Sequence, residues 1–142
     1  MSGIRLKAIL LGLLTDVTGS VLVGLALGAL MAVMAAASGD TSRNHLAALL
    51  ANPVVKLVGL AGTTFSTALG GYVASRLSRA NGIQNSLAVG VLSIVLAVAL
   101  AVLRPGVTPA WKLALGVVVT IPAALLGGRL ATRTEVDMRG VQ

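Results

Sequence analysis

Asp16 is the one acidic residue inside a long apolar stretch of this 142-residue chain. Burying an ionisable group in such a stretch costs at least about 2.5 kcal/mol, so the position is a candidate for proton or cation chemistry. If the apolar helix starts at Ala8, Asp16 lies about 12 Å inside it, because each helical residue rises about 1.5 Å. If the buried part starts at Val17, the carboxylate lies at an interface. There it would pair with Arg76 or Arg133, which is the arrangement we expect; a proton- or cation-coupled role is the alternative.

Hydroxyl side chains gather in the second apolar stretch and could line a polar path. They are those of Thr63, Thr64, Ser66 and Thr67. Such hydroxyls more often donate to the carbonyl four residues earlier or to a neighbouring helix, so we expect a structural role. Thr120 lies in the fourth apolar stretch, near Pro122, which should kink its helix. The candidate polar site within the apolar stretches is Asp16, Thr63, Thr67 and Thr120.

The residue types that carry most enzymatic chemistry are scarce. The chain has no Cys, which excludes disulfides, Fe–S clusters and thiol catalysis, and its one His, His45, has no partner nearby in sequence. A zinc site would need several such ligands. No HExxH, GxSxG or P-loop motif is present, and no second carboxylate is placed to work with Asp16. We therefore expect no enzyme, no metal and no cofactor.

Composition indicates the environment that must hold these residues. The chain is 56% hydrophobic and 11% charged, with a mean hydropathy of +0.97. A soluble domain has about a quarter of its residues charged, so this chain could not cover its surface with polar groups. The sequence predicts an all-α membrane protein.

Apolar runs of about 20 residues predict four transmembrane helices in a single domain, 1–142. They span about 8–38, 54–75, 86–103 and 110–131. The first run is too long for the apolar region of a signal peptide, about 7–15 residues, and predicts an uncleaved helix. The segment RNHLAALLAN (43–52) is too short to span and predicts a brief helix at the surface.

The positive charges indicate orientation. The chain has 11 Lys and Arg, 4 Asp and Glu, and a net charge of +7. The Lys and Arg residues lie at the ends of the apolar runs and do not form a patch with aromatic residues. We therefore expect no nucleic-acid partner. Cytoplasmic loops carry the excess of Lys and Arg, which predicts cytoplasmic termini in a cell (cytoplasmic) membrane. The basic residues on that side are Arg5, Lys7, Arg76, Arg79, Arg129, Arg133 and Arg139. Arg76 and Arg133 are placed to reach anionic lipid head groups.

One glycine-rich phrase occurs twice. LGGYVASR (69–76) returns as LGGRLATR (126–133), with five of eight positions identical. This predicts a helical hairpin used twice as a parallel repeat, with a pseudo-twofold axis along the membrane normal.

Small residues recur every four positions along each apolar stretch. Membrane helices associate by close packing at small residues, so these positions predict helix contacts. The second helix carries two such stripes and should lie centrally. The predicted packing glycines are Gly24, Gly28, Gly59, Gly70, Gly71, Gly116, Gly127 and Gly128.

The segment LGGYVASRLSRANGIQNSLAVGVLSIVL (69–96) resembles small bacterial four-helix integral membrane proteins of uncharacterised function. The shared features are a glycine pair at the end of the second helix, a basic turn and a glycine in the third helix. The resemblance implies a bacterial cytoplasmic-membrane protein and carries over no catalytic or binding residue.

Two functions remain. The first is an accessory or scaffolding subunit that binds partner membrane proteins through its Gly/Ala/Ser-rich helix faces. The alternative is a small homo-oligomeric transporter or channel for an ion or small solute, coupled through Asp16. The second function requires Asp16 and the threonines to face one shared cavity.

Overall fold

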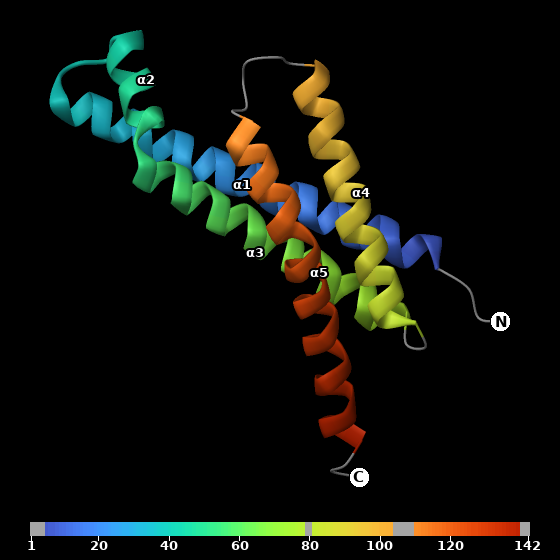
Figure 1. The fold of residues 1–142 in the computed structure, drawn as a ribbon. Helices are drawn as coiled ribbons and strands as arrows, with labels where there is room; N and C mark the ends of the chain where they lie inside the picture. Colours follow the sequence, from blue (N-terminus) through green and yellow to red (C-terminus); the bar gives the residue numbers. More distant parts are fainter. Residues whose placement is uncertain (1–4, 79–80, 104–109, 140–142) are drawn as a thin grey trace.

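The computed structural model describes residues 5–78, 81–103 and 110–139, and these form helices and short turns only. Figure 1 shows the five helices in chain order. They are α1 (Leu6–Ser38), α2 (Arg43–Ala51), α3 (Pro53–Ser78), α4 (Gly82–Leu103) and α5 (Ala110–Arg139). Four of the described helices, all but α2, contain stretches long and apolar enough to cross a membrane.

These helices agree with the predicted spans, and α2 coincides with the predicted short helix. The third span starts earlier than predicted. Its helix begins at Gly82, because both the backbone N–H and the side-chain amide of Asn85 donate to the carbonyl of Asn81, at 3.1 and 3.0 Å. Asn85 therefore lies inside the helix and not at its cap.

The connection between α1 and α3 is defined by local sequence. Gly39 ends α1 with a φ of 72°, a left-handed conformation that glycine adopts without strain. Ser42 then caps α2 by accepting a hydrogen bond from the His45 N–H at 3.2 Å. Asn52 accepts from the Val54 N–H at 2.9 Å, and Pro53 occupies the first position of α3, where no N–H is needed.

α3 is the central helix, as the two small-residue stripes predicted: it contacts α1, α2, α4 and α5. α1 and α4 begin, and α3 and α5 end, toward the same side of the molecule (Figure 1). α3 and α5 therefore run in the same direction and cross each other. α1 and α4 run the opposite way.

The helix contacts depart from a strict twofold. Such an axis would exchange α1 with α4 and α3 with α5, so the α3–α4 contact would have an α1–α5 counterpart. α3 and α4 do pack together, but α1 and α5 make no contact within the described residues. The duplication stays a prediction.

The buried apolar residues are few, and a cluster of three lies where α1 and α4 begin. It contains Ile9, Ala74 and Val89, each at most 4% exposed. Large apolar side chains point outward along every long helix, with Leu25 and Val33 both 65% exposed. An outer surface of this kind is suited to lipid, where apolar exposure costs nothing.

Candidate functional site

The carboxylate of Asp16 is buried where α1, α3 and α4 meet. Its residue is 5% exposed. The Thr67 hydroxyl donates to one carboxylate oxygen (Oδ1) at 2.8 Å, and the Ser93 hydroxyl donates to the other (Oδ2). Hydrogen bonds to an ionised group are the stronger kind, so both oxygens have a favourable partner.

This arrangement differs from the expected interfacial pair. No cationic side chain lies within 4 Å of Asp16 among those that the structure describes. Arg76 instead donates to the Tyr72 hydroxyl at 3.1 Å on the exposed surface, and Arg133 is also exposed. The reason is close approach: a Cβ added at Gly70 of α3 would lie 3.0 Å from the Asp16 Cβ, so only glycine lets α3 cover the carboxylate.

A cavity of about 540 Å³ opens beside this carboxylate. All four residues of the sequence-predicted polar site line it, as the transport alternative required. The described lining is Asp16, Ser20, Leu60, Thr63, Thr64, Thr67, Ser93, Ile94, Ala97, Leu100, Ala101, Leu113, Gly116, Val117 and Thr120. Four helices thus contribute to one space, with the acid at its inner end and apolar side chains toward the end where α4 stops and α5 starts.

The hydroxyls of the wall behave in two ways. Those of Thr63, Thr64 and Thr120 donate to carbonyls one turn earlier, at Gly59 O (3.1 Å), Leu60 O (2.7 Å) and Gly116 O (2.6 Å). At Thr63 and Thr64 this is the hydrogen bond that the sequence led us to expect, and Thr120 makes the same kind of bond. Thr67 is different: its hydroxyl lies 3.1 Å from the Thr63 carbonyl but 2.8 Å from Oδ1 of Asp16 on another helix.

Between the carboxylate and the end where α1 and α4 begin, the helices pack closely. The glycines of the two repeated segments, 69–76 and 126–133, make these contacts. A Cβ added at Gly127 would clash with the backbone carbonyl of Ala68, and one at Gly71 with that of Ala124. A Cβ added at Gly128 would clash with the Ser86 side chain. These glycines make the α3–α5 and α4–α5 contacts, so their predicted packing role agrees with the structure.

Hydroxyls and an amide complete the closure. Ser86 donates to the Gly71 carbonyl at 2.7 Å, and Ser75 donates to the Gly128 carbonyl at 3.1 Å. Fully buried Asn85 accepts from the Arg5 backbone N–H at 3.2 Å. Bonds between helices therefore hold this end, while the cavity lies on the other side of Asp16.

The structure differs from the predicted packing at three glycines. A Cβ added at Gly24, Gly28 or Gly116 meets no described atom within 4 Å. Gly116 lines the cavity, while Gly24 and Gly28 face outward from α1; a role in binding another chain stays a prediction for them. Gly59 of α3 packs against the Leu27 side chain of α1, since a Cβ added at Gly59 would lie 3.3 Å from Leu27 Cδ1.

Sequence reasoning missed the true contact face of α1. Gly12 packs on the Gly70 carbonyl and Gly19 on Ser66. Both lie on the same helical face as Asp16, three and four residues from it, so a stripe drawn through the acid would have found them. Sequence reasoning also missed Ser93 as a member of the polar site, although its hydroxyl donates to the carboxylate.

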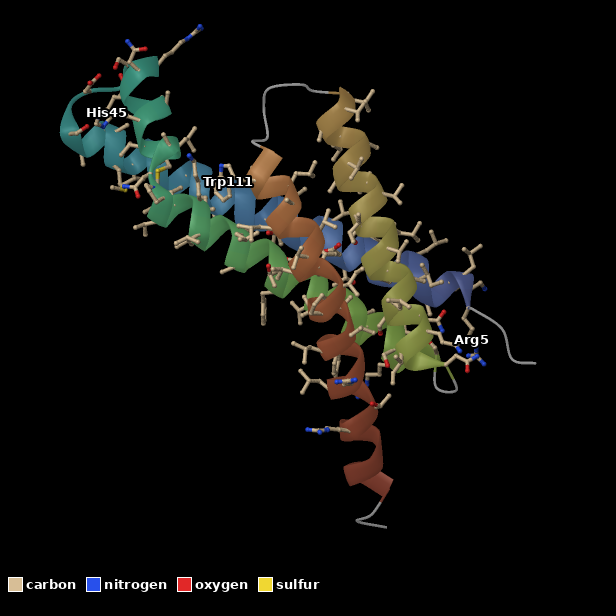
Figure 2. All side chains as sticks on the ribbon, viewed as in Figure 1. Arg5, His45 and Trp111 are labelled. Atoms are coloured by element: carbon tan, nitrogen blue, oxygen red, sulfur yellow. The ribbon has the colours of Figure 1, made fainter. Side chains whose placement is uncertain are left out.

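His45, Asp40 and Arg5 are described ionisable residues that do not line the cavity. Figure 2 shows His45 and Trp111 toward one end of the molecule and Arg5 at the other. His45 Nδ1 lies 3.8 Å from Asp40 Oδ2. Hydrogen bonds from the Ser42 side chain and backbone lower the pKa of Asp40, which is exposed and stays charged at neutral pH. Within the described part of the chain, no three His, Cys, Asp or Glu residues cluster to hold a metal ion.

Comparison with other proteins adds no assignment: no protein-family model, curated protein or solved structure matches this sequence.

Proposed function

We propose that this protein is a small membrane carrier that binds its cargo in the cavity beside Asp16. One observation supports this above all: a carboxylate 5% exposed lies at the inner end of a 540 Å³ cavity walled by four helices. Ionisable residues inside membrane proteins face cavities and mark ion or substrate pathways. Docking to partner proteins does not require a carboxylate beside a cavity, whereas binding of a cargo inside the membrane does.

The membrane and topology belong to the same proposal. We place the chain in a bacterial cytoplasmic membrane with both termini inside, because seven of its 11 basic residues lie on that side. The cavity then faces outward. The glycine closure formed by Gly71, Gly127 and Gly128 lies on the cytoplasmic side and serves as the inner gate.

A carrier of this kind exposes its site to each side of the membrane in turn. The chain has no Cys, so an introduced thiol is its only one. Ala97→Cys places a thiol on the cavity wall. Val95→Cys is the matched control two residues away, outside the cavity lining on the exposed surface of α4.

The experiment treats right-side-out and inside-out vesicles with a membrane-impermeant maleimide. We expect Ala97→Cys to be labelled from both sides and Val95→Cys from neither, because a thiol facing lipid does not ionise. Labelling of Ala97→Cys from one side only, or from neither, would contradict the carrier.

A second function, the accessory subunit, is favoured by the outward face of α1. Gly24, Gly28, Ala32 and Ala36 are exposed at four-residue spacing. A Cβ added at Gly24 or Gly28 would meet no described atom within 4 Å. Such a stripe is the surface that membrane helices use to associate. It is also compatible with a carrier that works as a homo-oligomer.

A further inference from the structure

We propose that the cavity takes a monovalent organic cation with an apolar body, such as a substituted ammonium. This inference rests on the proposed function only in treating the cavity as a binding site. It is carried by three properties of the wall: its charge, its hydrogen-bonding capacity and its apolar surface.

The charge of the described wall comes from one group. Asp16 is the only ionisable residue among the described side chains that line the cavity. A single carboxylate in a space of low polarity attracts a single positive charge and repels an anion. A monovalent cation would leave the filled cavity neutral, whereas a divalent cation would leave it positive.

Six described hydroxyls line the cavity, and five of them add acceptors but no free donor; the sixth, that of Ser20, makes no hydrogen bond with a described residue and can donate or accept. Those of Thr63, Thr64 and Thr120 already donate to carbonyls of their own helices. The hydroxyls of Thr67 and Ser93 donate to the carboxylate. Since each hydroxyl has one proton, what these five present to a ligand is oxygen lone pairs. A positively charged group is the ligand that gains from such a wall.

The apolar part of the wall argues against a bare inorganic ion. Five large aliphatic side chains line the space: Leu60, Ile94, Leu100, Leu113 and Val117. The volume of about 540 Å³ lies within the range of small-molecule pockets, about 300–1,000 Å³. Hard metal cations take six or more oxygen ligands at short distances, and no cluster of acidic ligands exists among the described residues. The shape and chemistry fit an organic body with its charge directed at Asp16.

The probe is benzyltrimethylammonium, whose charge does not change with pH, and its neutral isostere neopentylbenzene is the comparison. Equilibrium dialysis measures binding of the radiolabelled cation to the full-length protein in lipid nanodiscs, with empty nanodiscs as background. The variants are Asp16→Asn and, as a matched loss of exposed charge, Asp40→Asn.

We expect the wild type and Asp40→Asn to bind the cation equally. Asp16→Asn should bind at least about tenfold more weakly, a loss of about 1.4 kcal/mol. Neopentylbenzene should not compete at the concentration where the unlabelled cation displaces half of the label. Equal affinity of Asp16→Asn, or equal competition by the neutral isostere, would overturn the proposal, since the cavity would then be a site for apolar molecules or lipid chains.

A second variant keeps the test informative if Asp16→Asn does not fold. Ala97→Phe fills the cavity while it leaves the carboxylate and its two hydroxyl partners in place; Val95→Phe adds the same ring outside the lining. We expect the first to lose cation binding and the second to retain it, and retained binding in Ala97→Phe would overturn the site.

The outcomes also separate this inference from the proposed function. If the protein does not bind the cation but its Ala97→Cys variant is labelled from both sides, the organic-cation inference is wrong and the proposed carrier function still stands. Charge-selective binding with one-sided labelling would overturn the carrier and leave the cation site.

Discussion

Two hydroxyl donors make the burial of Asp16 tolerable. Thr67 and Ser93 come from different helices, so the carboxylate also ties α1 to α3 and α4. Removing one donor would leave one oxygen of a buried carboxyl group without its hydrogen-bond partner, which costs more than an ordinary hydrogen bond.

At this scale we predict that Thr67→Val lowers the free energy of unfolding by about 1–2 kcal/mol, because the valine has the same shape and no donor. Thr64→Val is the control, since that hydroxyl donates only to Leu60 of its own helix at 2.7 Å; it should cost less than about 0.5 kcal/mol. Unfolding in mixed micelles measures both. Equal losses would show that the hydroxyl–carboxylate bond contributes no special stability.

The burial of Asp16 could not be read from the sequence. It depends on where α1 starts and on how closely α3 approaches, and that approach requires glycine on both helices, at Gly12 of α1 and at Gly70 of α3. From the sequence alone, an ion pair with Arg76 or Arg133 was an equally good arrangement for the Asp16 carboxylate. What decided the outcome is Gly70, which lets α3 cover the carboxylate before either arginine can reach it.

At the scale of elements, the crossing of α3 and α5 depends on glycine. The carbonyl of Ala68 occupies the space where a Cβ at Gly127 would lie. Backbone cannot move aside as a flexible side chain can, so the two helices must separate to admit even a methyl group. The close contact of α3 and α5 at this end therefore requires glycine in the repeated segments 69–76 and 126–133.

We predict that Gly127→Ala destabilises the protein by about 1–3 kcal/mol, the usual cost of overpacking, or prevents folding. Gly24→Ala is the matched control. An added Cβ there meets no described atom within 4 Å, and alanine is favoured in a helix interior by roughly 0.8–1.0 kcal/mol. Thermal unfolding in detergent compares the two, and a Gly127→Ala melting temperature at or above the wild-type value would contradict the crossing.

Element positions were predictable, whereas element faces were not. Apolar length alone defines a membrane helix, and all four long helices lie where the hydropathy predicted. In lipid, however, both the packed and the exposed faces of a helix are apolar or small. α1 carries two stripes, one through Gly12 and Gly19 and one through Gly24 and Gly28, and the structure uses the first within the chain.

On the scale of the whole molecule, the exposed α1 stripe through Gly24 and Gly28 is where we predict a contact with another chain. We predict that Gly28→Leu converts an oligomer to monomers in native mass spectrometry with lipid attached, because leucine prevents close approach of the helices. Leu25→Ala, on a side chain 65% exposed, is the control for a general change of the α1 surface and should leave the oligomer intact. An unchanged mass distribution in Gly28→Leu would exclude this stripe as the interface.

The molecule as a whole is closed at one end and hollow toward the other. Glycine contacts and buried hydroxyls close the end where α1 and α4 begin, and the cavity lies between Asp16 and the end where α4 stops. Movement of cargo through the closed end would require α3 and α5 to part at Gly71 and Gly127. The proposed carrier therefore needs a second arrangement of the same helices.

The most direct test is uptake of radiolabelled benzyltrimethylammonium into proteoliposomes that carry an imposed pH gradient. We predict uptake above that of empty liposomes for the wild type and for Asp40→Asn, and uptake at the empty-liposome level for Asp16→Asn. Uptake by Asp16→Asn equal to that of the wild type, or wild-type uptake no greater than that of empty liposomes, would contradict the account.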